Sequence, residues 1–168
     1  MKKDQRLEKD GATGRYVVFY GSSDELGALS NFSDHSVTLP NPWTGKHTTY
    51  LTGEHRFQAM KATNARDHDW VSGSSSPYHA KRAGRVITLR SGWGNDVNCI
   101  CWFVMCEIVM AKLCQNSDVF ELLAGIRGFI YEDSPIDPIW GWRMYANYSG
   151  RNLLGKAWMQ ARFLRLGY

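Results

Sequence analysis

The chain has 168 residues, enough for one domain with a hydrophobic core of its own. Its formal net charge of +4 is compatible with a phosphorylated or nucleic-acid substrate, but it is not the charge of a protein that coats DNA. No apolar run approaches the roughly 20 residues that a membrane span needs.

The start of the chain mixes both charge signs, and we expect residues 1–14 to be disordered and 15–168 to form the folded domain. No apolar segment of a signal peptide is present there. The cysteines have neither CxxC nor zinc-like spacing, and all fall in one predicted helix: Cys99, Cys101, Cys106 and Cys114. Buried thiols in a reducing compartment fit this pattern, so we expect an intracellular protein, cytoplasmic or nuclear.

The first half of the domain is predicted to hold two strands and two helices. Residues 15–21 and 36–40 are predicted strands, and residues 41–47 a turn or loop. A helix is predicted to begin after Thr52 as N-cap and to run to about Ala65. After a loop at 72–77, Ser76 is expected to cap a short helix with Pro77 in its first position.

The second half is predicted to be mostly helical. Residues 93–116 are apolar almost all round, which predicts a buried central helix. Residues 117–125 predict another helix, 128–133 a short strand, 137–142 a loop, and 152–166 a closing helix capped by Asn152. No repeat or linker is found. The expected fold is therefore a single α+β domain, predominantly α-helical with a few short strands.

The stretch "GEHRFQAMKA" (53–62) carries the most unusual pattern. On a helix, Glu54, Phe57, Gln58 and Lys61 lie on one face, which mixes an acid, a ring, an amide and an amine. An amine becomes a nucleophile in a desolvated site that lowers its pKa, and a carboxylate nearby can shuttle protons. A solvated helix face is the alternative, and the helix alone favours it.

Other stretches carry weaker signals of the same kind. Residues 74–85 combine a helix start with Lys81, Arg82 and Arg85, which suits a phosphate as well as a solvated basic face. Residues 133–142 form a stiff loop that carries two tryptophans and Asp137, although Asp before Pro is also a common turn start. Gly155 inside the closing helix indicates a close approach by another backbone or a ligand.

Taken in order, these stretches resemble the NADAR family, also called YbiA-like. The motifs are "LSNF" (29–32), "EHRFQAMKA" (54–62), "SPYHAKRAGR" (76–85), a Trp near 93, "DPIWG" (137–141) and "GRNLLGKAWM" (150–159). The resemblance runs from about residue 17 to 166. Leu51 and Gly53 stand where the family often has Pro and Ser, and residues 41–47 look like an insertion.

The resemblance implies a hydrolase of N-glycosidic bonds. It implies removal of ADP-ribose from the exocyclic amino group of guanine in nucleic acid, through a Schiff base on Lys61 with Glu54 as acid and base. Asp137 completes the implied catalytic set. The residues implied to bind substrate are Asn31, Phe32, Phe57, Gln58, Arg82, Arg85, Trp93, Trp140, Gly141 and Asn152. Neither a metal nor a cofactor is expected, with ADP-ribose entering only as part of the substrate.

Several alternatives stay open at this point. Water could attack directly, with Glu54 as base and no covalent step. The substrate could instead be a ribosylamino-pyrimidine of riboflavin synthesis, or the protein could be a reader that binds ADP-ribose or NAD without cleaving it. The sequence leaves open whether DNA, RNA or a free nucleotide is bound, and whether an ADP-ribosyltransferase toxin is the counterpart. A monomer without membrane partners is expected.

Overall fold

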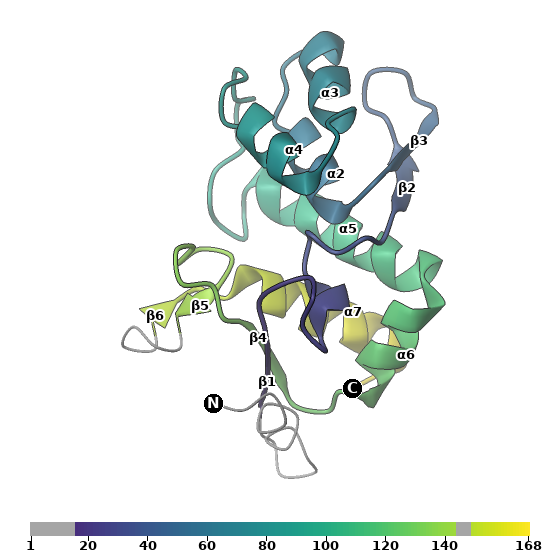
Figure 1. Ribbon diagram of the computed structural model, residues 1–168, viewed down its shortest axis with the longest axis vertical. Coiled ribbons are helices and arrows are strands. Elements are labelled where there is room, and N and C mark those ends of the chain that lie inside the picture. Colours follow the sequence, from purple (N-terminus) through teal and green to yellow (C-terminus); the bar gives the residue numbers. More distant parts are fainter. Residues whose placement is uncertain (1–15, 144–148) are drawn as a thin grey trace. The chain divides into compact units, whose positions relative to one another are not determined.

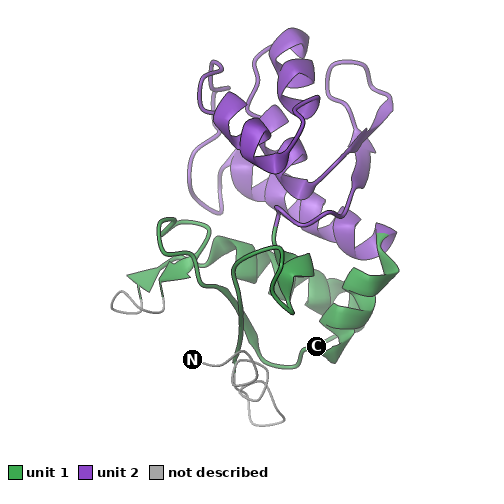
Figure 2. Ribbon diagram, in the orientation of Figure 1, with its two compact units in different colours: residues 1–30, 116–168 green, residues 31–115 purple. Residues whose placement is uncertain are grey.

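The computed structural model describes residues 16–143 and 149–168 (Figure 1). The segment expected to be disordered, 1–14, and the residues 144–148 of the aromatic-rich stretch after Trp140 lie outside the described residues. The described chain divides into two compact units (Figure 2): residues up to Ser30 and from Asn116 onward form unit 1, and Asn31–Gln115 form unit 2. Helices dominate and strands are short, so the predicted α+β class is confirmed. The single-domain assignment stays a prediction.

Unit 2 is built around one fully buried helix. Strands β2 (Val37–Pro40) and β3 (His47–Tyr50) form an antiparallel hairpin, followed by helices α2 (Gly53–Ala59), α3 (Ala65–Ser72), α4 (Pro77–Ala83) and α5 (Ile100–Gln115). Helix α2 packs against α3, α4, α5 and β3 (Figure 1). Each residue of α2 is buried. Polar side chains of α2 therefore need partners inside the protein.

Arg56 shows how this buried helix satisfies a charge. Its guanidinium donates to the Pro40 carbonyl at 3.0 Å and to the Tyr50 hydroxyl at 2.9 Å, and it pairs with the Glu107 carboxylate at 2.9 Å. The Tyr50 hydroxyl lies 3.1 Å from Nε2 of the buried His68. Since these groups come from β2, β3, α3 and α5, the network fixes α2 within unit 2.

Unit 1 combines chain segments from before and after unit 2. Strands β1 (Tyr16–Phe19) and β4 (Phe129–Glu132) pair in parallel, with Tyr16 opposite Phe129. The other elements are the 3₁₀ helix η1 (Gly27–Leu29), helices α6 (Ser117–Gly125) and α7 (Leu153–Leu166), and the short pair β5 (Trp142–Arg143) with β6 (Ser149–Gly150). Helix α7 packs against β4 and α6, and its fully buried Trp158 donates from Nε1 to the Leu29 carbonyl at 2.8 Å.

Most predicted elements are confirmed, and the errors have local causes. The helix after Thr52 ends at Ala59, not near Ala65, and Asn64 then caps α3, which the prediction missed. Strand β3 was also missed. Helix α5 begins at Ile100, not at residue 93. Gly94, inside the predicted segment, has φ 54°, a left-handed conformation that a right-handed helix does not contain.

The expectation of uniformly buried cysteines on one buried helix is partly wrong. All four thiols are free, but Cys114 is exposed, and Cys99 lies before α5 begins. Phe103 on α5 is 64% exposed, so the apolar helix leaves one side uncovered. In the described part of the chain, no helix combines the length and apolar character needed to cross a membrane.

Candidate active site

The start of α2 places Glu54 inside unit 2. Thr52 is the N-cap, as predicted, and its hydroxyl accepts from the His55 backbone N–H. The Glu54 N–H donates to the Asn31 carbonyl at 2.9 Å, so Asn31 lies against the helix start. His55 is fully buried between the Thr52 hydroxyl and the Ser74 carbonyl, and burial lowers the pKa of its ring. His55 is therefore a buried packing residue, and the group that orients Glu54 is a different one.

That group is Gln58, one helical turn further on. Gln58 Nε2 donates to Glu54 Oε1 at 2.8 Å. The two side chains expose 4% and 5% of their surface, so the bond is inside the protein. An amide N–H directed at a carboxylate oxygen stabilises the ionised acid, the form in which it accepts a proton.

Lys61 lies beyond the end of α2, although the sequence pattern placed it on that helix. Its backbone N–H bonds to the Gln58 carbonyl at 3.2 Å, and its carbonyl accepts from the Arg90 N–H at 2.9 Å. The amine lies 5.6 Å from the Phe57 ring centroid and 6.0 Å from that of Trp93. These rings meet edge to face at 5.1 Å. The amine is thus held against an aromatic wall.

The surroundings of Lys61 lower the pKa of its amine. Burial is the largest cause, and the nearby charges of Lys81 and Arg85 act in the same direction, because each disfavours another positive charge. The Glu54 carboxylate opposes the shift, so Glu54 and Lys61 are close enough to interact electrostatically. The net direction is downward, as expected for an amine that must be neutral to act as a nucleophile.

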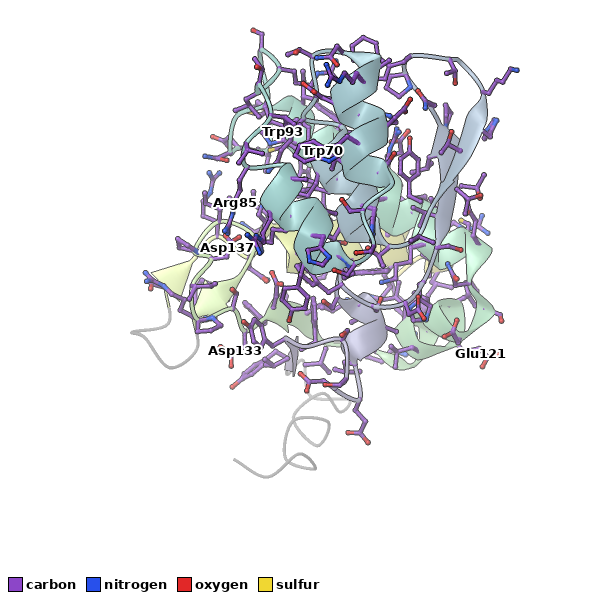
Figure 3. All side chains as sticks on the ribbon, turned by 45° about the horizontal axis from the view of Figure 1, so that its top comes forward. Trp70, Arg85, Trp93, Glu121, Asp133 and Asp137 are labelled. Carbon is purple, nitrogen blue, oxygen red and sulfur yellow. The ribbon has the colours of Figure 1, made fainter. Side chains whose placement is uncertain are left out.

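Helix α4 and the residues just after it supply positively charged side chains and the ring of Tyr78. Lys81 Nζ lies 5.2 Å from the centroid of Phe32, and Phe32 meets Tyr78 edge to face at 5.0 Å. Arg82 and Arg85 are exposed, and Figure 3 labels Arg85 together with Trp93 among the side chains of unit 2. Ser76 caps the helix as predicted, with its hydroxyl accepting from the His79 N–H. This edge of the site can meet an anion and a flat ring.

Trp93 is placed by its backbone. Its N–H bonds to the Arg90 carbonyl, and its own carbonyl accepts from the Cys101 N–H at the start of α5. The side chain is 5% exposed. The Trp93 ring therefore lies beside the Lys61 amine. Its role in stacking on a base stays a prediction.

The "DPIWG" motif lies in unit 1 and forms a closed loop. Asp137 Oδ1 accepts from the N–H groups of Ile139 and Trp140, each at 3.0 Å, which is the turn-start arrangement. A Cβ on Gly141 would lie 2.4 Å from that of Ser134, so only glycine fits there. The structure gives Asp137 this turn role, and its catalytic role stays a prediction.

Asn152 behaves differently from the expected cap. It occupies the N-cap position of α7 with φ 51°, and its side chain makes no capping bond. Instead Nδ2 donates to the Ile130 carbonyl at 2.8 Å, and Oδ1 accepts from the Glu132 N–H at 3.1 Å. A Cβ on Gly155 would lie 2.1 Å from the Ile130 carbonyl oxygen, which confirms the predicted close approach of another backbone. Asn152 and Gly155 thus dock α7 on β4.

The predicted site residues divide between the two units. Unit 2 gathers Glu54, Gln58, Lys61, Phe57 and Trp93 around one amine and one carboxylate, with Asn31, Phe32, Arg82 and Arg85 on the flanking elements. Unit 1 holds Asp137, Trp140, Gly141 and Asn152. Lys81, which the sequence groups with Arg82 and Arg85 but which is not among the predicted substrate-binding residues, also influences Lys61. Among the described residues, no three His, Cys, Asp or Glu side chains gather as metal ligands would.

Comparison with known proteins identifies the family. The model of the NADAR domain matches residues 18–164. The chain belongs to the NADAR family. Its residues 54–62 and 150–159, which carry the resemblance in the sequence, both fall inside the matched range.

The chain is similar to several named proteins and to one solved structure. N-glycosidase Npun_R5314 of Nostoc punctiforme is 30% identical over 87% of this chain and 90% of its own length. N-glycosidase YbiA of Escherichia coli is 31% identical over 87% and 86%. The maize chloroplastic riboflavin biosynthesis protein PYRR is 32% identical over 90% of this chain but only 25% of its own length. The NMR structure of E. coli YbiA matches 98% of this chain and 92% of its own with a TM-score of 0.76 at 28% identity.

Proposed function

We propose that this protein is an N-glycosidase that removes ADP-ribose from the exocyclic amino group of guanine in nucleic acid. The names of the Nostoc and E. coli relatives support the N-glycosidase class. The finer assignment rests on the family resemblance and on the chemistry available around Lys61. The observation that carries it is the Lys61 amine, held against Phe57 and Trp93 with a lowered pKa, beside Glu54.

The proposed reaction passes through a Schiff base. Opening of the ribose ring gives an imine between C1 and the guanine nitrogen, and the neutral Lys61 amine adds to C1. Lys61 loses two protons in this exchange: Glu54 takes them from the attacking nitrogen and passes them in turn to the guanine nitrogen, and the C1–guanine bond breaks as a C1–Lys61 imine forms. In the second half, Glu54 moves the two protons of a water molecule to the Lys61 nitrogen as the water oxygen adds to C1 and the C1–Lys61 bond breaks. The C1 aldehyde left behind then closes the ribose ring again.

Charged and aromatic side chains account for the rest of the substrate. Arg85 and Lys81 are positive and close enough to influence Lys61, so they suit the diphosphate of ADP-ribose. Gln58 orients Glu54, and Phe32 offers a ring on which a base can stack, a contact worth about 1–3 kcal/mol. Asp137 and Trp140 of the "DPIWG" loop are assigned to the ribose and a base on the resemblance alone.

The function is tested with a single-stranded oligonucleotide that carries ADP-ribose on guanine, followed by mass spectrometry. We expect the ADP-ribose mass to be lost and unmodified guanine to be recovered. Glu54→Gln keeps the size of the side chain and its bond partner, and it should slow the reaction by roughly 10²–10⁴-fold. Binding of ADP-ribose without any cleavage would instead identify a reader.

The covalent step needs a separate test. Borohydride added during turnover should reduce the imine and link ribose to the wild-type protein, and peptide mapping should place the added mass on Lys61. Lys61→Met should show no adduct. Wild-type turnover by Lys61→Met would overturn the Schiff base and favour direct attack by water with Glu54 as base.

A second substrate is supported by the similarity to the maize protein named for riboflavin biosynthesis. Ribosylamino-pyrimidine phosphates of that pathway contain the same type of bond, from ribose C1 to an exocyclic nitrogen. Cleavage of this small substrate, together with no release from the oligonucleotide, would assign the protein to metabolite hydrolysis.

A further inference from the structure

Helix α4 ends with a glycine that touches the partner of the proposed acid–base residue. Gly84 is the C-cap of α4, and a Cβ built on it would lie 2.2 Å from Gln58 Oε1, 2.9 Å from Gln58 Cβ and 3.0 Å from Gln58 Cδ. No side chain fits there while Gln58 keeps its present position. The Gln58 side chain therefore lies against the backbone at the C-terminal end of α4.

The backbone conformation does not explain why this residue is glycine. Gly84 has φ −64° and ψ −9°, a right-handed helical conformation that any residue adopts. A helix C-cap in that conformation has no need for the left-handed region that favours glycine. The close approach of Gln58 is thus the structural reason for glycine at position 84.

The contact also leaves a polar atom without a partner. Gln58 Oε1 is buried and accepts no hydrogen bond from the described residues, whereas Nε2 of the same amide donates to Glu54. Buried polar atoms are seldom left unpaired, because they lose their hydration without compensation. Turning the amide around would direct Oε1 at the Glu54 carboxylate, and two acceptors repel. In the observed orientation, Oε1 lacks a hydrogen-bond donor within the described part of the chain, but Nε2 keeps its hydrogen bond to the Glu54 carboxylate.

We propose that Gly84 is a positioning residue for the active site. Because Gly84 has no side chain, the Gln58 amide can lie between the end of α4 and Glu54. There it holds the Glu54 carboxylate in place. The proposal rests on the proposed function only in the role of Glu54. It assigns to α4 a second task beside presenting Lys81 and Arg82: the C-cap of the helix packs against Gln58, which in turn holds the Glu54 carboxylate.

The kinetic test compares Gly84→Ala with a matched glycine. Gly73 is the C-cap of α3, has φ −83°, and a Cβ there would meet only the Asp69 carbonyl oxygen, at 3.1 Å. We expect Gly84→Ala to lower kcat by about 10²-fold, as small misplacements of catalytic groups do, with KM within about twofold of the wild type. Gly73→Ala should keep both constants. Equal kcat values for the two variants would overturn the proposal.

A double substitution separates positioning from loss of folding. Gln58→Ala removes Oε1 and Cδ but keeps Cβ, which a Cβ at position 84 would still approach to 2.9 Å. Adding Gly84→Ala to Gln58→Ala should therefore cost clearly less, in both kcat and Tm, than Gly84→Ala costs in the wild type. Gly84→Ala alone should lower both. Additive losses in the double variant would mean that Gly84 acts independently of Gln58, and the proposal would fail.

A third measurement does not depend on turnover. In ¹H–¹⁵N NMR spectra, the Gln58 side-chain amide is identified as the signal pair missing from Gln58→Ala. One proton of that pair should lie downfield in the wild type and in Gly73→Ala, because it is bonded to a carboxylate, and should move upfield in Gly84→Ala. If the wild type hydrolyses neither proposed substrate yet shows this pattern, the proposed function fails and the positioning contact stands. An unchanged amide signal in Gly84→Ala overturns the contact itself.

Discussion

Lys61 shows how a single residue obtains unusual chemistry from its neighbours. An amine beside aromatic rings gains some attraction as a cation, which would keep it protonated. At Lys61 the loss of water and the like charges of Lys81 and Arg85 outweigh the pull of Glu54, and the pKa falls. The residue is therefore easier to deprotonate than a surface lysine, and this makes its proposed role measurable.

The pH dependence of kcat/KM should report the Lys61 pKa. Below that pKa only a fraction of the amine is neutral, so the rate should rise about tenfold per pH unit and then level off, at a pH below the ordinary lysine value of 10.5. Arg85→Gln removes a like charge, so it should move the inflection to higher pH. Initial rates on the oligonucleotide across pH check this, and an unmoved inflection in Arg85→Gln would contradict it.

The same shift predicts an effect on stability. Between the lowered pKa and 10.5, the unfolded chain holds the Lys61 proton and the folded chain does not, so raising the pH stabilises the fold. Lys61→Met lacks this rise. Its free energy of unfolding should exceed that of the wild type at pH 7, and the difference should shrink toward pH 10. Urea titrations at several pH values measure the free energy of unfolding of the two proteins. A difference between them that stays constant with pH would count against the lowered pKa of Lys61.

At the scale of elements, α5 holds thiols in different environments. Burial raises the pKa of the Cys106 thiol to about 11 and raises that of the buried Cys101 thiol as well, whereas Cys114 near the helix end is exposed. Iodoacetamide reacts with thiolates. A pKa moved from 9.0 to about 11 reduces the thiolate fraction roughly 100-fold.

Brief alkylation of the native protein at pH 8 should therefore label Cys114 first. Mass spectrometry of the peptides would give the order, and Cys114→Ser should remove the fast phase while the slower labelling remains. Equal labelling of Cys106 and Cys114 would contradict the burial of α5 on the Cys106 side. Denatured protein, in which all thiols are accessible, provides the reference rates.

The elements also show where sequence reasoning succeeds and where it stops. Caps with a clear chemical signal were predicted correctly, such as Thr52 for α2 and Ser76 before Pro77 for α4. Asn64 followed by Asp67 was an equally good cap signal for α3, and Asn64 Oδ1 does accept from the Asp67 N–H, but the apolar pattern was continued across it. Apolar content alone also extended α5 too far toward Trp93.

The candidate site was predictable where the motif lies on one helix and much less so elsewhere. Glu54 and Gln58 are one turn apart, and their bond follows from that spacing. The wall that Trp93 adds behind Lys61 depends on Arg90 bonding back to the Lys61 carbonyl, a contact no local pattern encodes. Asn152 looked like an ordinary cap, whereas its side chain bonds to β4, because only the fold brings that strand to the helix.

At the scale of the whole molecule, α7 ties distant parts of the chain together inside unit 1. Trp158 is fully buried and donates to the Leu29 carbonyl, more than 120 residues earlier in the sequence. Arg162 on the same helix donates to the carbonyls of Ile126 and Gly128. Unit 1 therefore depends on contacts between its N-terminal and C-terminal segments.

Trp158→Phe should reveal the strength of that dependence. The change keeps an aromatic ring but leaves the buried Leu29 carbonyl without its donor, which should lower the free energy of unfolding by about 1–3 kcal/mol. The cavity left by the smaller ring lowers it further. Phe163 lies on the same helix and is 65% exposed, so Phe163→Ala should stay within about 0.5 kcal/mol of the wild type. Urea unfolding followed by circular dichroism compares them, and equal stabilities would contradict the role of Trp158.

The parallel pairing of β1 with β4 has a consequence for synthesis on the ribosome. Unit 2 is one continuous stretch, Asn31–Gln115, so its elements leave the ribosome one after another without interruption by unit 1. Strand β1 emerges before them, yet its partner begins only at Phe129. At about 5–20 residues per second, β1 waits on the order of 5–20 s with its apolar Val17, Val18 and Phe19 uncovered. During translation this strand is therefore an apolar segment open to a nascent-chain chaperone until β4 emerges.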